Sequence, residues 1–489
     1  MASDTGSGPT IVWFRRDLRL TDHPALRAAI DAGDPLVCLY IRETGKDAPR
    51  SPGGARAWWL HGSLAALAAG LEDLGQRLIL RSGNALDCLE AVIGETGAAR
   101  VYWNRDYEKA AIARDTAVKT ALKNRDLTVE SFNGALLREP WEIVNGSGDP
   151  YKVFSAYWRA SLGAGDMPEP LPRPRKLPAP PEKKTMSSEA LEDWDLLPSK
   201  PDWADGLRDT WTPGEKAALD RLKTFLDDAA SQYAEDRDRP DRKGTSMLSP
   251  HLVHGEISPR TIYQTVMGRI EDGSVPAKQA EKFLAEIGWR EFSYTLLYHN
   301  PDLPRQSLRP EFKDFPWEKD KKALKAWQRG QTGYPIVDAG MRQLYEIGWM
   351  HNRVRMIVGS LLVKHLLIPW QEGEDWFWDT LVDADPANNS AGWQWIAGCG
   401  ADAAPYFRVF NPVLQGQRYD PDGDYVRRFV PELAKMPAKH IHDPWNAPKD
   451  VLKDAGVTLG VDYPHPIIDH KKGRERALAA FETIKGKAA

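Results

Sequence analysis

The sequence predicts a doubly wound, mostly parallel α/β domain at the N-terminus, followed by a long linker and a large all-helical domain. Strand-like and helix-like segments alternate over the first 130 residues, the pattern of a parallel sheet with helices on its faces. A run rich in proline and charge at residues 163–185 indicates an extended connector. Beyond about residue 213 helical periodicity continues without a convincing strand pattern. We expect the α/β domain over 8–135, the linker over 136–212 and the helical domain over 213–485.

Each element of the α/β domain has its own signature. β-branched and aromatic residues gather in strand-like runs at 10–14, 35–41, 77–82, 100–103 and 127–132. Helix-like segments lie between them, near 24–32, 55–74, 85–94 and 108–123. The first strand is followed by FRRDLRL and not by a GxGxxG turn. A standard dinucleotide fingerprint is therefore absent, and a nucleotide-binding transferase is disfavoured.

Composition excludes several classes of protein. The chain has 489 residues, 42% of them hydrophobic and 27% charged, which is typical of globular proteins and not of disordered ones. Its net charge of -4 neither shows nor excludes a local basic patch. The three cysteines form no CxxC pair, so we expect neither a zinc site nor a disulfide framework, and a reducing cytoplasm fits.

No segment of the sequence predicts membrane insertion. The opening MASDTGSGPT has no apolar signal core. The longest apolar stretch, 356–370, is interrupted by Lys364 and His365, so we predict a buried helix there.

The segment GTSMLSPHLVHGEISPR (244–260) contains two Ser-Pro steps that predict helix starts. Ser249 and Ser258 each fit a capping position followed by proline in the first turn. Small polar residues precede the first step, and such a loop at a helix N-terminus suits a phosphate or diphosphate. An ordinary capped helix is the alternative, and the residues by themselves favour it.

Two helical segments combine charged, aromatic and amide side chains at helical spacing. Glu286, Trp289 and Arg290 lie within one turn, where they could bond to and stack on a heterocycle. The segment GWMHNRVRMIV (348–358) has amide, guanidinium and thioether groups suited to nucleic-acid edges and phosphates. A surface ion pair beside a half-buried tryptophan, and an amphipathic helix with a cationic face, are the respective alternatives.

The segment LVDADPANNSAGWQW (381–395) places two carboxylates ahead of two tryptophans that are surrounded by small residues. No histidine is near and no calcium-loop pattern is present, so a metal is disfavoured. We expect Asp383 and Asp385 to pair with Arg355 and a ligand amide. The small residues leave room for a closely approaching backbone or a flat ligand.

Taken together, these stretches resemble the cryptochrome/photolyase family of flavoproteins, and most closely its class I cyclobutane pyrimidine dimer DNA photolyases. The resemblance covers nearly the whole chain. It is carried by VWFRRDLRLTDHPAL (12–26), TGYPIVDAGMRQLYEIGWMHNRVRM (332–356) and NNSAGWQWIAGCGADAAPYFRVFNP (388–412).

The resemblance implies that the helical domain binds FAD. The matching positions are Tyr233, Thr245, Ser246, Met247, Leu248, Ser249, Phe283, Arg290, Asn352, Arg355, Asp383, Asp385 and Asn389. The 245–249 loop and Tyr233 would contact the diphosphate and ribityl chain. Asn389 would face flavin N5 and favour the reduced flavin.

The resemblance also implies a light-driven repair mechanism. Excited reduced FAD would donate an electron to a pyrimidine dimer, the cyclobutane ring would split, and the electron would return. Trp393, Trp370 and Trp317 match the family's electron-transfer triad. Glu286, Trp289, Asn352, Met356 and Trp395 match the pocket for the flipped-out dimer, with Arg237 and Arg353 at nearby phosphates.

Three departures and alternatives bear on this expectation. Ala110, Ala111 and Pro304 stand where folate-binding relatives have contact residues, so folate is disfavoured and the identity of any second antenna chromophore stays open. A cryptochrome-type photoreceptor is the main alternative function. Asn389 and the short C-terminal end favour repair over signalling, and His351-Asn352 favours cyclobutane over (6-4) lesions. We expect a cytoplasmic monomer that acts on DNA and not on membranes.

Overall fold

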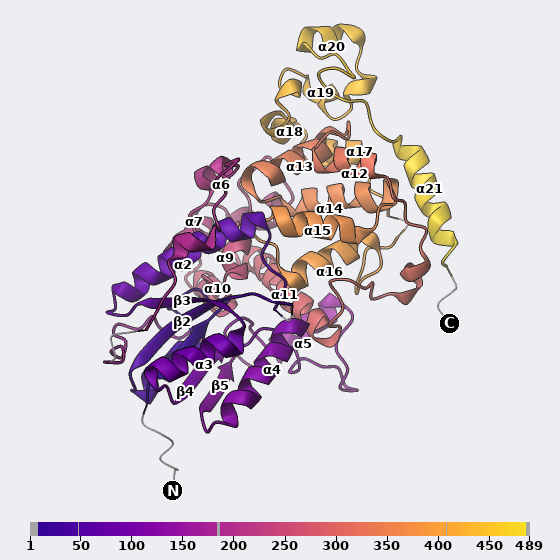
Figure 1. Ribbon diagram of the computed structural model, residues 1–489. Helices are drawn as coiled ribbons and strands as arrows, with labels where there is room; N and C mark the ends of the chain where they lie inside the picture. Colours follow the sequence, from indigo (N-terminus) through magenta and orange to yellow (C-terminus); the bar gives the residue numbers. More distant parts are fainter. Residues whose placement is uncertain (1–7, 47, 183–185, 407, 486–489) are drawn as a thin grey trace.

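The computed structural model describes residues 8–46, 48–182, 186–406 and 408–485, which form an α/β domain and a helical domain (Figure 1). A five-stranded sheet with the order β3-β2-β1-β4-β5 organises the first domain, and all of its neighbouring strands are parallel. The strands are β1 (Thr10–Phe14), β2 (Leu36–Glu43), β3 (Leu78–Gly83), β4 (Arg100–Asn104) and β5 (Thr128–Phe132). The predicted doubly wound sheet is confirmed.

Helices cover both faces of this sheet because the strand residues alternate between two apolar cores. Ile11 and Trp13 face the core built with α3 (Ala85–Thr96) and α4 (Lys109–Lys123). Val12 and Phe14 face the opposite core, which contains α1 (Pro24–Ala32) and α2 (Gly54–Glu72). The side-chain period of two along a strand produces this division.

The connector between the domains is fastened to both of them. Its proline-rich part runs beside the sheet, where Leu36 donates its backbone N–H to the Ala179 carbonyl at 2.9 Å. Helix α5 (Phe154–Gly163) packs instead on the long α11 (Ala277–His299), and a short α6 (Asp205–Thr210) packs near α13 (Pro335–Ile347). The connector thus helps to fix the orientation of the domains.

The remaining part of the chain is helical, and the described residues after β5 contain no further strand beyond two isolated bridges. Its α-helices are α7 (Glu215–Asp228), α8 (Tyr233–Asp236), α9 (Ser249–Val253), α10 (Pro259–Glu271), α11, α12 (Lys321–Gln328), α13 (Pro335–Ile347), α14 (Asn352–Ser360), α15 (Trp370–Thr380), α16 (Pro386–Ala397), α17 (Pro412–Tyr419), α18 (Asp424–Phe429), α19 (Ala438–Ile441), α20 (Lys449–Ala455) and α21 (His470–Glu482).

The apolar stretch 356–370 is buried as predicted, but it is not one helix. Helix α14 passes into a π-helical turn at Leu361–His365, and the chain then breaks before α15. Leu367 has a φ of 54°, and Pro369 lies directly before α15, so continuous helical hydrogen bonding ends there. This break lets α15 start at Trp370 in a new direction.

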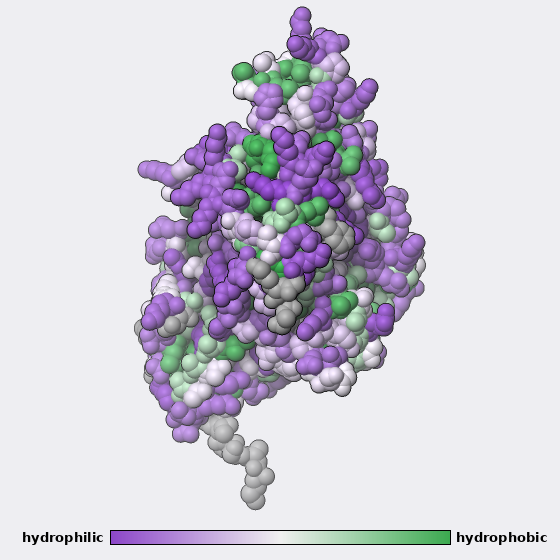
Figure 2. Space-filling view, turned by 90° about the vertical axis from the view of Figure 1, so that its right-hand side faces the viewer, coloured by the Kyte–Doolittle hydropathy of each residue, from purple (hydrophilic) through white to green (hydrophobic). Residues whose placement is uncertain are grey.

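The surface shown in Figure 2 is mostly hydrophilic, with hydrophobic residues in small separate patches. Among the described residues, no helix is both long enough and apolar enough to cross a bilayer.

Candidate flavin and DNA site

Helices α11, α14, α15 and α16 position most of the predicted site residues. Helix α16 packs against each of the other three. Asp385 begins α16 by accepting hydrogen bonds from the backbone N–H groups of Ala387 at 3.0 Å and Asn388 at 2.7 Å. This cap fixes the rotation of α16, and therefore which of its side chains face α15.

Asn389 is held by Glu374 of α15. Its amide Nδ2 donates to the Glu374 carbonyl oxygen at 3.1 Å and to the Glu374 carboxylate at 2.8 Å. Burial raises the pKa of Glu374, and Arg50 from the N-terminal domain opposes this rise with hydrogen bonds of 2.9 Å to both carboxylate oxygens. Both Asn389 donors are thereby used, and its Oδ1 remains an acceptor.

Trp393 lies one helical turn from Asn389 and packs on Phe377 of α15. The centres of the two rings are 5.0 Å apart, and the Trp327 ring is 6.1 Å from Trp393. Gly373 makes this packing feasible, because a Cβ built there would lie 2.1 Å from a ring carbon of Trp393. The Trp393 Nε1 is buried without a hydrogen-bond partner among the described residues.

The other two predicted triad members belong to the same apolar core as Trp393. Trp370 is fully buried at the start of α15, and its Nε1 donates to the Ser307 hydroxyl at 3.1 Å. Trp317 is half-buried and packs on Phe315 with ring centres 4.4 Å apart. The order from buried to half-buried agrees with a route toward the surface, and the triad itself remains a prediction.

Of the two carboxylates expected to pair with Arg355 and a ligand amide, Asp383 pairs with Arg355, and a pairing of Asp385 with a ligand amide stays a prediction. Arg355 Nη2 donates to the Asp383 oxygens at 2.8 and 3.1 Å. Asp385 instead accepts from the Tyr294 hydroxyl at 2.5 Å while it caps α16. The cap explains the difference, because backbone N–H groups at a helix start compete for the same carboxylate.

Glu286, Trp289 and Arg290 share a helix, but each has separate partners. Glu286 forms an ion pair with Arg237, whereas the Trp289 ring stacks on Phe154 with centres 3.9 Å apart. Arg290 turns to the interdomain side and donates to the carbonyl of residue 135 at 2.9 Å. The three side chains therefore contact three different parts of the chain: Arg237, Phe154 and residue 135.

On α14, Asn352 is exposed while its neighbours are engaged. His351 precedes it and caps the helix by accepting from Arg353 N–H at 3.2 Å. Arg353 pairs with Asp238 at 2.8 Å and lies 4.4 Å from the centre of the Tyr419 ring. Met356 and Trp395 are both half-buried at the edge of the helical core.

The loop before α9 differs in one respect from prediction. Ser258 caps α10 as expected, but Ser249 does not cap α9; Leu248 occupies the capping position without a side-chain bond. The Ser249 hydroxyl accepts from Trp349 Nε1 at 3.2 Å instead. Met247 has a φ of 50°, an unusual backbone conformation that turns the loop sharply.

The rest of this loop has polar groups that the protein does not fully use. The Thr245 hydroxyl has no hydrogen bond to any described residue, and the Ser246 hydroxyl makes only a long one of 3.4 Å to Leu248 N–H. Tyr233 and Phe283 lie close by, with ring centres 5.4 Å apart. The loop thus offers hydroxyl and backbone groups next to aromatic side chains.

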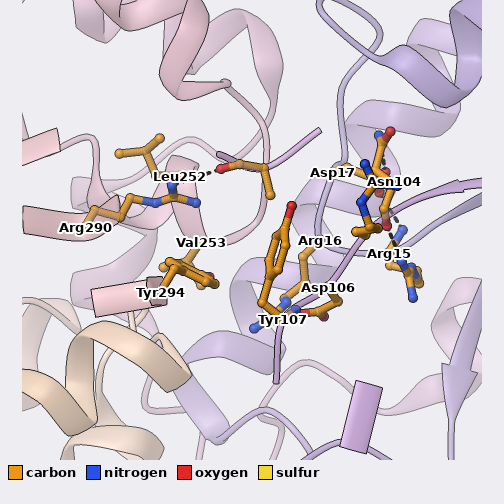
Figure 3. A pocket seen from close by; sticks show the side chains of 12 residues that line it. Arg15, Arg16, Asp17, Asn104, Asp106, Tyr107, Leu252, Val253, Arg290 and Tyr294 are labelled. Atoms are coloured by element: carbon orange, nitrogen blue, oxygen red, sulfur yellow. Dashed lines mark hydrogen bonds and ion pairs between the residues drawn. The ribbon is translucent and has the colours of Figure 1, made fainter. Parts of the chain in front are cut away.

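A charged cleft between the two domains was missed by the sequence prediction. Its cavity volume is only about 20 Å³, and Figure 3 shows side chains of the sheet end facing Arg290 and Tyr294 of α11. Its walls include Arg15, Arg16, Asp17, Asn104, Arg105, Asp106, Tyr107, Leu252 and Val253.

The charges in this cleft are paired. Arg16 bonds to Asp106 and, with its neighbouring arginines, holds the pKa of that carboxyl below its usual value despite burial. The cleft lies where β1 and β4 end, and the chain leaves these adjacent strands in opposite directions there. That position favours ligand binding in doubly wound sheets. The sequence signal for this cleft is the charged segment FRRDLRL at the end of the first strand, which supplies Arg15, Arg16 and Asp17.

No group of three or more His, Cys, Asp or Glu side chains within the described ranges is placed to hold a metal ion.

Comparisons with known proteins agree with this arrangement. The family described as DNA photolyase matches residues 10–178, and the FAD binding domain of DNA photolyase matches residues 283–483. A deoxyribodipyrimidine photo-lyase of Agrobacterium fabrum is 54% identical, with 98% of each chain covered. Cryptochrome-1 of Arabidopsis thaliana is 39% identical over 99% of this chain and 71% of its own length.

Solved structures give the same family. A bacterial class III photolyase from Agrobacterium tumefaciens has a TM-score of 0.95 and 53% identity, with 99% of each chain covered. The sequence motifs resemble those of class I enzymes most closely, whereas this similar structure is of a class III enzyme.

Proposed function

Because this chain belongs to the photolyase and cryptochrome family and is an enzyme of the photo-lyase type, we propose that it repairs cyclobutane pyrimidine dimers in DNA by light-driven electron transfer from reduced FAD. The observation that carries the proposal is the fixed orientation of Asn389. Its amide hydrogens are used by Glu374, so its Oδ1 is available to the N5–H of a reduced flavin.

Several of the predicted residues carry groups that suit the parts of an FAD molecule. The Asn389 Oδ1 supplies an acceptor, and the Arg355–Asp383 pair supplies both donors and acceptors for a polar ring edge. The Thr245 hydroxyl and its neighbouring backbone would hold the diphosphate. Since α9 has only five residues, this loop rather than a helix dipole would provide the binding.

FAD, when bound, supplies the electron that opens the dimer and receives it back. The protein would hold the cofactor, orient the lesion and exclude water. Asn389 would stabilise the reduced flavin by accepting a hydrogen bond. Trp393, Trp370 and Trp317 would restore that reduced state by passing electrons inward from the surface.

The lesion would lie between α11 and α16. A dimer inside a duplex must be extruded to reach a buried cofactor, and its weakened stacking lowers that cost. Trp289 and Trp395 would stack on the extruded bases, and Glu286 and Asn352 would bond to their edges. Arg237 now pairs with Glu286, so lesion binding would exchange this ion pair for contacts with bases and phosphate.

We assign no position to a second, light-harvesting chromophore, because the charged interdomain cleft has a volume of only about 20 Å³ and its arginines are already paired. The identity of that chromophore is left to extraction and mass spectrometry of the purified protein.

The test is blue-light repair of two duplexes that differ only in lesion, one with a thymine cyclobutane dimer and one with a (6-4) photoproduct. The FAD is reduced beforehand, and each duplex has a dark control. We expect light-dependent thymine restoration in the first duplex alone. Repair of only the second would contradict the lesion class, and no repair despite bound, photoreducible FAD would favour the photoreceptor alternative.

A further inference from the structure

Arg50 bridges the two domains, although neither the sequence patterns nor the family resemblance singled it out. It precedes α2 in the N-terminal domain, and its guanidinium reaches α15 of the helical domain. Nη1 donates to both Glu374 oxygens at 2.9 Å, and Nη2 donates to Asp375 at 2.6 Å. The guanidinium also lies 4.2 Å from the centre of the Trp378 ring.

Glu374 connects Arg50 to Asn389. The Glu374 side chain is fully buried, whereas that of Arg50 keeps 30% of its surface exposed. The same carboxylate oxygen, Oε1, accepts from Arg50 and from the Asn389 amide. A single buried carboxylate therefore lies between a cation of one domain and the amide at the predicted flavin position of the other.

We propose that Arg50 is a positioning residue for the flavin site: it keeps Glu374 ionised, and Glu374 in turn holds Asn389 with its oxygen free to accept. This inference rests on the proposed function, in which Asn389 meets flavin N5. It gives the N-terminal domain a direct part in flavin chemistry, separate from any antenna chromophore.

The charges around Glu374 make Arg50 its main stabilising partner. Burial disfavours the ionised carboxylate and raises its pKa, and Arg50 is the foremost group that lowers it. Arg305 is farther away, at 3.8 Å, and is half exposed and also paired with Asp375 at 2.9 Å. Asp375 itself acts in the opposite direction, because a neighbouring negative charge raises the pKa of Glu374.

Protonation of Glu374 would change how Asn389 is held. A carboxylate is an acceptor only, so it selects the NH₂ end of the amide and leaves the oxygen outward. A neutral carboxylic acid can also donate, and its hydrogen bond from Asn389 loses the assistance of the charge. Only the hydrogen bond to the Glu374 backbone carbonyl would then still select the NH₂ end of the amide, so the amide oxygen would be held toward the cofactor less firmly.

The test measures the dark oxidation rate of photoreduced FAD as a function of pH in wild type, Arg50→Met, Glu374→Gln and Asp375→Asn. Removing an adjacent cation raises the pKa of a carboxyl by about 1–3 units, so the midpoint of the Arg50→Met profile should move upward by about that amount. At neutral pH, Arg50→Met should behave like Glu374→Gln. Asp375→Asn removes the other ion pair of Arg50 and should show no upward shift.

Superimposable profiles for Arg50→Met and wild type would overturn the inference. Arg50→Lys keeps the charge and should restore the wild-type midpoint, which a purely steric role of Arg50 would not predict. If Arg50→Met fails to retain FAD, a wild-type profile for Glu374→Gln would also overturn the inference. Asn389→Ala separates the two proposals: an unchanged oxidation rate in that variant would refute the placement of Asn389 itself.

Discussion

Replacing Gly373 with alanine should disturb the contact between α15 and Trp393. The added Cβ would lie 2.1, 2.5 and 2.5 Å from three ring carbons of Trp393, so the ring or the helix must shift. Overpacking of this kind costs about 1–3 kcal/mol. Replacing a helical glycine by alanine also stabilises a protein by about 0.4–1 kcal/mol, because alanine lowers the conformational entropy of the unfolded chain. We expect a net loss of up to about 2.6 kcal/mol in the free energy of unfolding, and slower photoreduction of oxidised FAD.

Gly392→Ala is the matched control. Gly392 is exposed in α16, adjacent in sequence to Trp393, and a Cβ there would meet no atom within 4 Å. The free energy of unfolding of this variant should rise by about 0.4–1 kcal/mol, and its FAD should be photoreduced at the wild-type rate. The assay is urea unfolding scored on the transition that releases flavin, because two domains need not unfold together. Equal stability and equal photoreduction of the two variants would refute the proposed packing.

Three further predictions follow from the site. Trp393→Phe should block photoreduction of oxidised FAD yet spare repair by enzyme reduced beforehand, and loss of both would show that Trp393 has another role. Glu286→Gln should lower the repair yield with FAD content unchanged, whereas flavin loss in absorbance spectra would make Glu286 structural. Burial lowers the pKa of Lys364 to about 7 from its usual 10.5. The unfolded chain therefore binds an extra proton between those values, and the free energy of unfolding should rise by about 1.4 kcal/mol per pH unit there. Lys364→Met should abolish this rise of the unfolding free energy with pH, measured by urea titrations at several pH values. An unchanged slope would contradict the role given to Lys364.

The fold was predictable because its signals are local. The five strands and four helices of the α/β domain follow from alternation and helical spacing, and each is found close to its expected range. The π-helical turn after α14 was not predictable from the apolar run 356–370. Hydropathy reports burial, but it does not report where backbone hydrogen bonding changes register.

The site was predictable in part, for a related reason. Helical spacing and the family resemblance identified Asn389, Arg355 and Asp383, and the structure shows how two of them pair. They could not identify Arg50, which is 324 residues from Glu374 in the sequence. Nor could they show that Asp385 would cap α16 and bond to Tyr294, because that choice depends on which neighbour the folded chain supplies.

The most direct test of the central claim is a single-flash experiment on prereduced enzyme bound to a thymine-dimer duplex. Recovery of thymine ultraviolet absorbance is followed after the flash, with an unirradiated sample as reference. The account predicts recovery of thymine together with return of the reduced-flavin spectrum, since the electron goes back to the cofactor. Excitation of the reduced flavin without any thymine recovery would contradict it.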